Sequence, residues 1–146
     1  MKYRYLLIDN DNTLMDFHAA EHAALREALT EAGIEPTDAV CARYSAINDA
    51  LWKALERGET THAALKITRF AQLLAEYPAE NVCAPRLALR YSHYLGTHAD
   101  LMPGAEAFLR CLHGQMKIVL VSNGDSVIQR LSLIHISEPT RLLSIS

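Results

Sequence analysis

Residues 3–13 read YRYLLIDNDNT, and this stretch decides the fold class. The first six are aromatic or aliphatic apart from one arginine and are too few for a helix, so they predict a buried β-strand. The polar run Asp9–Thr13 follows at once and predicts a loop at the carboxyl end of that strand. Because open α/β sheets bind ligands beyond the carboxyl ends of their strands, this loop is the first candidate site.

A second run of the same kind, MKIVLV at residues 116–121, predicts another buried strand. Apolar residues between the two strands recur at helical spacing, with breakers between the segments. We expect helices over residues 17–32, 38–57, 61–77, 80–96 and 105–112, and the start of another at residue 126.

The order of these elements predicts an α/β protein. Two parallel strands with a helical block between them indicate a core sheet that carries an all-α cap, inserted after the first strand. We place the first core segment at residues 1–16, the cap at 17–100 and the second core segment at 101–130.

The last sixteen residues have a different character. Residues 131–141, LSLIHISEPTR, lack a helical period and match the translation of a transposase-end adapter used in sequencing libraries. We therefore expect residues 131–146 to be a non-native read-through tail, and the parallel sheet to be incomplete, with two strands. Such a sheet leaves a face and edges uncovered, which predicts poor solubility or oligomerisation, although the oligomeric state itself is unknown.

Composition excludes several classes of function. The chain has 146 residues, of which 50% are hydrophobic and 21% charged, with a formal net charge of −3. This is an ordinary globular composition without the basic excess that nucleic acid or anionic lipid would need, so we expect neither as a partner. Three widely spaced cysteines, no CxxC pair, no signal sequence and no apolar stretch of membrane length favour a cytoplasmic location.

Two carboxylates in the first loop carry the sharpest chemical signal. Asp9 and Asp11 lie two residues apart, so one can act as nucleophile and the other as general acid on the same substrate. Mg²⁺ would offset the like charges of these carboxylates and a phosphate. A plain polar turn is the alternative. A calcium loop is excluded, because Leu14 and Ala20 stand where it needs Gly and Glu.

The second strand ends in groups that suit an anion. Ser122, Asn123 and Gly124 offer a hydroxyl, a side-chain amide and exposed backbone N–H groups. Parallel neighbouring strands would bring these groups to the same edge of the sheet as the two aspartates. The alternative is a simple turn.

These residues resemble a known family. Residues 9–14 (DNDNTL) resemble the first motif, D-x-D-x-T, of the haloacid dehalogenase (HAD) superfamily, and residues 119–124 resemble its second motif. Residues 101–105 are similar to the Met-Pro-Gly turn after the cap. KYRYLLIDNDNTLMDF, ARYSAINDALWKALERGE and residues 68–70 look most like the noncanonical pyrimidine 5′-nucleotidases, and the resemblance spans about residues 1–130.

The resemblance implies a magnesium-dependent phosphatase acting on nucleoside 5′-monophosphates through an aspartyl-phosphate. Asp9 would be the nucleophile and a Mg²⁺ ligand, and Asp11 the general acid and base, with its backbone carbonyl also on the metal. Ser122 would bind the phosphoryl group with backbone N–H groups near Asn10, Asp11 and Asn123. Since the dehalogenases of the superfamily lack the second aspartate, Asp11 favours phosphoryl transfer.

The chain also departs from the family pattern. The family has two further motifs after Ser122, one with a lysine and one with acidic metal ligands. They have no counterpart here, because the acidic and basic side chains after Ser122 are Asp125, Arg130, Glu138 and Arg141. Loss of such electrostatic partners typically costs a few kcal/mol of transition-state stabilisation. We therefore expect this chain to be inactive through truncation. The alternatives are a sugar-phosphate or phosphoglycolate phosphatase, or a non-catalytic fragment acting as a binding or dimerisation module.

The helical cap would select the substrate. Phe17 and Trp52 are candidates for stacking on a nucleobase, and Arg69 for reaching a phosphate or a base edge. The competing interpretation is core packing for the two aromatic residues and a solvated surface position for Arg69. His18 and His22 are spaced like metal ligands, but no third ligand is evident, and we expect them on a helix surface.

Overall fold

A computed structural model describes residues 3–98, 100–122 and 141–144 of the chain. The chain forms two compact units, which we call the core unit (residues 1–21 and 95–146) and the cap unit (His22–Tyr94). The division falls five or six residues inside the boundaries predicted for the cap, 17 and 100. No helix within the described ranges is both long and apolar enough to cross a membrane.

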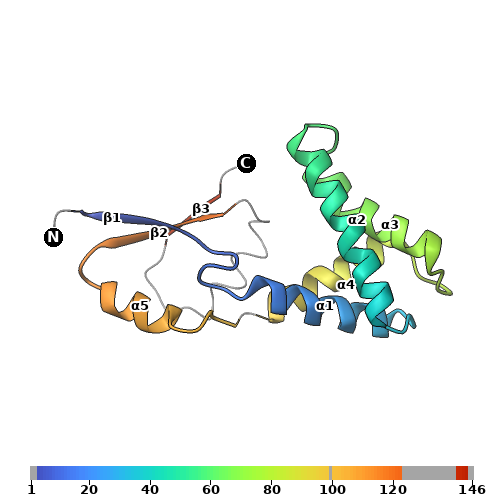
Figure 1. Ribbon diagram of the computed structural model, residues 1–146, viewed down its shortest axis with the longest axis horizontal. Coiled ribbons are helices and arrows are strands. Elements are labelled where there is room, and N and C mark those ends of the chain that lie inside the picture. The colour runs from blue at the N-terminus through green and yellow to red at the C-terminus, as the bar shows by residue number, and fades with distance from the viewer. Residues whose placement is uncertain (1–2, 99, 123–140, 145–146) are drawn as a thin grey trace. The chain divides into compact units, whose positions relative to one another are not determined.

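The core unit contains a parallel sheet with strand order β1-β2-β3 (Figure 1). Its members are β1 (Tyr5–Asp9), β2 (Lys117–Ser122) and β3 (Arg141–Ser144), and helix α5 (Ala105–Leu112) precedes β2. β1 and β2 pair in register from Tyr5 with Lys117 to Asp9 with Val121. Strands β1 and β2 and helix α5 were all predicted from the sequence, so the α/β core fold is confirmed.

The expectation of only two strands is wrong. Arg141–Ser144 lies in the segment predicted to be a read-through tail, yet it pairs in parallel with β2, from Val119 with Arg141 to Ser122 with Ser144. Pairing satisfies the backbone N–H and C=O groups on the second edge of β2, which an edge strand would leave open. The helix predicted to start at residue 126 lies outside the described residues.

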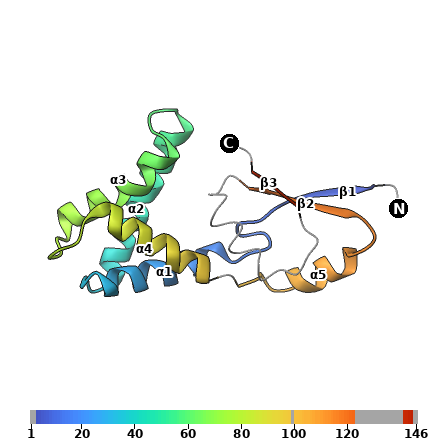
Figure 2. The ribbon, with the colours of Figure 1, turned by 180° about the vertical axis from the view of Figure 1, so that it is seen from behind.

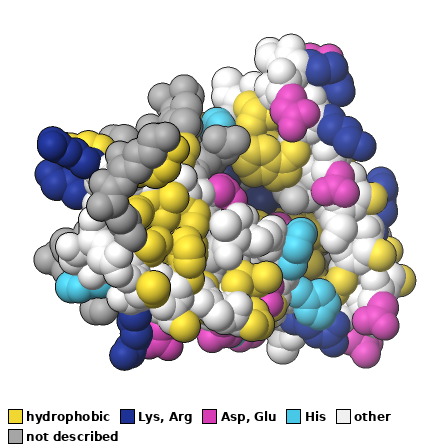
Figure 3. Space-filling model, turned by 60° about the vertical axis from the view of Figure 1, so that its left-hand side comes forward, with side chains coloured by type: hydrophobic (Ala, Val, Ile, Leu, Met, Phe, Trp, Pro, Cys, Tyr) yellow, Lys and Arg dark blue, Asp and Glu magenta, His cyan; other side chains and the backbone are white. Residues whose placement is uncertain are grey.

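One face of β1 is uncovered. Tyr5 and Leu7 are 57% and 65% exposed, whereas the alternate residues Leu6 and Ile8 are half-buried. A buried cluster of Leu14, Ala105 and Leu120 joins the sheet to α5, and Ile8 packs against this cluster. Figure 3 shows exposed hydrophobic side chains on one face of the molecule. The predicted open face is therefore present, and its effect on solubility stays a prediction.

The cap unit is helical (Figure 2). Helix α1 begins in the core unit and continues into the cap unit, and three more helices follow: α1 (Phe17–Glu31), α2 (Asp38–Glu56), α3 (His62–Glu76) and α4 (Ala84–Thr97). Helix α4 begins four residues later than predicted. Asn81 has a left-handed φ of 59°, which ends the preceding turn, and Pro85 occupies the first turn of α4, where its missing N–H is tolerated.

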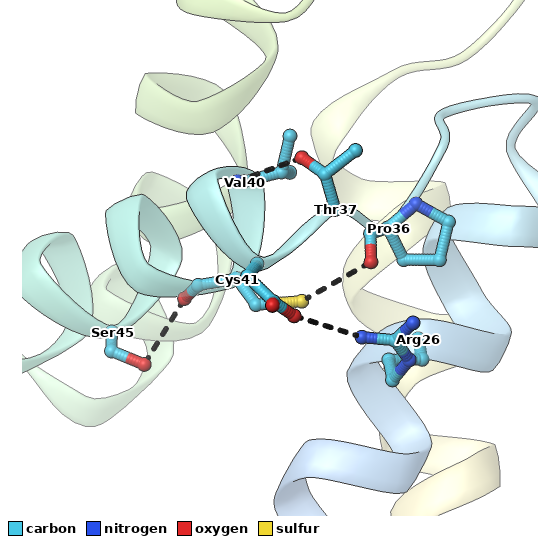
Figure 4. Close-up of polar contacts among 7 residues, drawn as sticks. Arg26, Pro36, Thr37, Val40, Cys41 and Ser45 are labelled. Carbon is cyan, nitrogen blue, oxygen red and sulfur yellow. Dashed lines mark hydrogen bonds and ion pairs between the residues drawn. The ribbon is translucent and has the colours of Figure 1, made fainter.

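The start of α2 shows why α2 and α3 begin at, or within one residue of, the positions that the sequence predicts. Thr37 is the N-cap, and its Oγ1 accepts a hydrogen bond from the N–H of Val40 at 3.3 Å (Figure 4). The acidic Asp38 lies in the first turn, where it is favoured by the helix dipole, and an ion pair of 3.8 Å joins it to Arg26 of α1. Thr61 caps α3 in the same way. These caps fix how α2 and α3 begin.

Candidate active site

The two predicted motifs meet at one edge of the sheet. Asp9 ends β1 and pairs in register with Val121, so Ser122 lies one residue beyond that pair at the end of β2. The Asp9 side chain is exposed, while Ser122 is 2% exposed. The parallel pairing thus brings a carboxylate and a hydroxyl residue to the same sheet edge. Asn123 lies outside the described residues, so its predicted phosphate role stays a prediction.

The Asp9–Thr13 loop is built around the carbonyl oxygen of Asn10. This oxygen accepts hydrogen bonds from the N–H groups of Thr13, Leu14 and Met15, at 3.3, 2.9 and 3.0 Å. In a trans peptide the carbonyl and the following N–H point in opposite directions, so the N–H of Asp11 is directed away from the interior of this turn. That orientation suits a backbone N–H that donates to an anion.

Side chains within the loop hold the two carboxylates. Thr13 Oγ1 donates to Asp9 Oδ2 at 2.9 Å, and Asn10 Nδ2 donates to Asp11 Oδ1 at 3.3 Å. Asn10 is 1% exposed, so its side chain acts within the loop, and a phosphate could use only its backbone. Both hydrogen bonds orient the carboxyl groups within the loop.

The carboxylates of Asp9 and Asp11 offer hard oxygen ligands of the kind that Mg²⁺ prefers. The residues that the structure describes include no group of three or more His, Cys, Asp or Glu side chains that could hold a metal. The described donor set is therefore two carboxylates supplemented by backbone carbonyls and water. This set fits Mg²⁺, which normally keeps several waters and takes one or two protein carboxylates.

The loop is hydrogen-bonded to the segment through which the chain returns from the cap. Met15 pairs with Leu101 in a short antiparallel bridge, and Met102 N–H donates to the Leu14 carbonyl at 2.8 Å. Asp16 N–H donates to the Asp100 carbonyl at 2.9 Å. The outgoing and returning connections are thus tied together beside the two aspartates. This pairing could not be predicted from side-chain chemistry, because it consists of hydrogen bonds between backbone groups.

Arg69, a candidate for reaching a phosphate or a base edge, is buried, so the competing interpretation of a solvated surface position is wrong. It is 7% exposed, and its Nη1 donates to Asn48 Oδ1 at 3.1 Å. Its guanidinium carbon lies 4.7, 5.3 and 5.8 Å from the ring centroids of Tyr91, Phe70 and Tyr44. It forms no ion pair with any carboxylate that the structure describes. Arg69 therefore belongs to the core of the cap unit.

The other two cap candidates keep partial access to solvent. Trp52 on α2 is half-buried, and its ring packs edge-on against His62 at a centroid distance of 5.6 Å. Phe17 is half-buried at the start of α1 and belongs to the core unit, whereas Trp52 belongs to the cap unit. Stacking on a nucleobase stays a prediction for both. His18 and His22 lie on the helix surface, as expected.

Sequence reasoning missed the part played by Asn12. Its Oδ1 accepts a hydrogen bond from the N–H of His18 at 3.0 Å, and Asp16 Oδ1 accepts from Ala19 N–H at 3.0 Å. Both side chains satisfy N–H groups in the first turn of α1, which have no partner within the helix. An Asn four or more residues ahead of a helix is not a standard capping signal, so only Asp16 could have been found from the sequence.

The fold and the candidate site together define the class of protein to which this chain is similar. The chain has an HAD-like α/β fold, with a D-x-D-x-T loop at the end of β1 and Ser122 at the end of β2. The predicted resemblance to the HAD superfamily is confirmed, because the chain has homologues among its hydrolases and structural neighbours with its fold. No protein-family model matches the chain.

Two relatives and one solved structure place the chain more closely. A Bacillus subtilis protein named as an HAD-hydrolase, YfnB, is 38% identical over 125 residues, which are 86% of this chain and 53% of YfnB. The pyrimidine 5′-nucleotidase PynA of Streptococcus pneumoniae is 36% identical over 130 residues, 88% of this chain and 54% of PynA. The magnesium-bound crystal structure of YfnB superposes with a TM-score of 0.84 and 36% identity, over 92% of this chain and 59% of that one. The chain therefore spans about half the length of the relatives it matches.

Proposed function

We propose that this chain is part of a magnesium-dependent phosphatase that hydrolyses nucleoside 5′-monophosphates. The observation that carries the proposal is the arrangement of Asp9 and Asp11 in one loop, at the sheet edge where Ser122 ends β2. The relative named as a pyrimidine 5′-nucleotidase supports the substrate class. The second aspartate supports phosphoryl transfer rather than dehalogenation.

In the first step a carboxylate oxygen of Asp9 attacks phosphorus, and the bond from phosphorus to the ester oxygen breaks. Asp11 gives its proton to the leaving alkoxide, which departs as the nucleoside alcohol. Thr13 keeps the Asp9 carboxylate oriented through its 2.9 Å hydrogen bond. Asp9 then carries the phosphoryl group as an acyl phosphate.

In the second step water attacks the same phosphorus, and the bond between phosphorus and the Asp9 oxygen breaks. Asp11 takes the proton of the attacking water and so returns to its starting state. The hydroxyl of Ser122 and the backbone N–H of Asp11 hold the phosphoryl oxygens during both steps. Mg²⁺, held by the Asp9 carboxylate and the Asp11 carbonyl, would supply positive charge that offsets the phosphate and the two aspartates.

The 146-residue chain by itself should turn over little substrate. Residues after Ser122 offer neither a lysine nor a pair of acidic ligands, and the chain spans about half of its relatives. Without that positive charge and those ligands, the developing charge on the phosphoryl group is poorly stabilised. A fragment that only binds or dimerises would share this inactivity, so the parent reading frame has to be tested as well.

The test is phosphate release from CMP, UMP and a sugar phosphate, with MgCl₂ or with EDTA. The protein assayed is the continuation of this reading frame past residue 130, beside the 146-residue chain. We expect magnesium-dependent release by the longer protein, lost in its Asp9→Asn variant, and background rates from the short chain. A longer protein that prefers the sugar phosphate would overturn the substrate class. Nucleotide hydrolysis by the short chain, abolished by Asp9→Asn, would overturn its proposed inactivity.

A further inference from the structure

Asn12 has an unusual backbone conformation next to Asp11. Its φ is 58°, and the described residues include one other non-glycine residue with positive φ, Asn81. A left-handed backbone is unfavourable for an ordinary L-residue, and asparagine is among the few residues that tolerate it. Hydrogen bonds of the loop therefore hold Asn12 in this conformation and offset its unfavourable backbone energy.

The first of these bonds fixes the peptide unit between Asp11 and Asn12. The N–H of Asn12 donates to the Met15 carbonyl at 2.7 Å, and Met15 N–H donates to the Asn10 carbonyl on the other side of Asp11. Because a trans peptide is planar, the Asp11 carbonyl must point away from Met15. Both peptide units that flank Asp11 are thus oriented by Met15.

The second bond anchors the Asn12 side chain. Its Oδ1 accepts from the N–H of His18, in the first turn of α1, at 3.0 Å. This contact fixes Asn12 against a helix rather than against another loop residue. Asp16 accepts from the same turn of α1, but no hydrogen bond described for Asp16 involves a peptide unit of Asp11.

We propose that Asn12 is a positioning residue, which holds the Asp11 carbonyl oxygen toward a divalent cation by anchoring the Asp11–Asn12 peptide to α1. The inference rests on the proposed function, because the cation belongs to it. Groups that do not touch the metal but hold one of its ligands in position are important for binding. Their removal typically lowers metal affinity 10-fold to 100-fold. A left-handed Asn at this position thus has a role that a glycine could not fill completely.

The test is a titration with MgCl₂ of two ¹⁵N-labelled proteins, the 146-residue chain and its continuation past residue 130, followed by the NMR amide signals of residues 9–15. Asn12→Gly keeps the left-handed backbone free of strain and removes the side-chain anchor, while glycine also makes the backbone more flexible. We expect its apparent Mg²⁺ affinity to fall about tenfold. Asp16→Ala is the matched control, because it removes the other side-chain cap of the same helix turn, and its Mg²⁺ affinity should equal that of the wild type.

Amide hydrogen exchange in metal-free protein gives a second measure. The amide at position 12 should exchange faster in Asn12→Gly than in the wild type, and at the wild-type rate in Asp16→Ala. Equal Mg²⁺ affinity of Asn12→Gly and wild type would overturn the inference, as would an equal loss in Asp16→Ala, which would indicate a general effect of the helix end. A wild-type protein continued past residue 130 without any Mg²⁺-dependent shift would overturn the metal part of the proposed function instead. Unchanged amide exchange at position 12 in Asn12→Gly would overturn the claim that the Asn12 side chain anchors this peptide to α1.

Discussion

Replacing Arg69 with Met tests whether a buried cation stabilises the cap unit. Arg69→Met keeps an unbranched chain of similar length but removes the charge, the hydrogen bond to Asn48 and the contacts with three aromatic rings. A hydrogen bond from a charged group contributes about 1.5–3 kcal/mol, and a desolvated cation–π contact about 1–2 kcal/mol. Methionine sulfur regains part of the aromatic contact.

The opposing effect is desolvation of the guanidinium. Removing a charge from water costs several kcal/mol, and no carboxylate that the structure describes pairs with Arg69 to offset it. Asn48 and the rings of Tyr44, Phe70 and Tyr91 must therefore supply that compensation. Because the bonds are lost while their partners stay buried, we expect a net destabilisation of about 2–3 kcal/mol.

The assay is urea unfolding followed by the fluorescence of Trp52, which is the single tryptophan of the chain and lies in the cap unit. Arg43→Met is the matched control on α2: its guanidinium pairs with Glu76 at 2.6 Å, but both side chains are more than 40% exposed, so we expect a urea midpoint close to that of the wild type. A double-mutant cycle with Asn48→Ala should give a coupling of about 1 kcal/mol or more. An Arg69→Met variant as stable as the wild type would refute the reasoning, since desolvation would then cancel the contacts.

Two further predictions concern the cap unit. The hydrogen bond from Arg90, followed by that from Tyr94, lowers the pKa of Glu31 below its ordinary value, so the stabilisation from this cluster is present above the unfolded-state pKa and is lost as the pH falls through the folded-state pKa. Urea midpoints measured between about pH 6 and pH 3 should therefore decrease less for Glu31→Gln than for the wild type, and parallel decreases would contradict this assignment. Phe70→Ala should cost about 3–5 kcal/mol, because Phe70 is 0% exposed, whereas Ile67→Ala on the same helix, at 43% exposure, should cost under about 1 kcal/mol. Equal losses in thermal unfolding of these two variants would show that burial is not the cause.

Local chemistry determined how much of the fold could be predicted. The helix that begins at Asp38 carries its own start signal, because Thr37 caps it and the acidic side chain follows. β1 and β2 were predictable because each is a short apolar run that ends in polar residues. β3 was missed because Arg141–Ser144 lies in a segment excluded as a tail, and four residues carry too little periodicity to identify a strand. Pairing with β2 defines it, and pairing is not a local property.

The difference between local signals and non-local contacts also explains which residues of the candidate site could be predicted from the sequence. Asp9, Asp11 and Ser122 were found because their side-chain chemistry is specific and their strands are recognisable. The burial of Arg69 was not foreseen, because an arginine is usually exposed and its burial depends on rings contributed by three separate helices. No spacing rule along the sequence predicts that three such rings converge on one guanidinium.

Met15 is a second example of a residue in the site whose role depends on contacts with residues distant in the sequence. Its backbone binds the peptide units on both sides of Asp11, and the same residue pairs with Leu101 in the returning connection. Any residue type except proline could make these backbone bonds, so the side chains of Met15 and Leu101 give no chemical signal in the sequence. The position of Asp11 therefore depends on a segment almost ninety residues away in the chain. Substitutions in that returning segment should disturb the candidate site without changing any of its side chains.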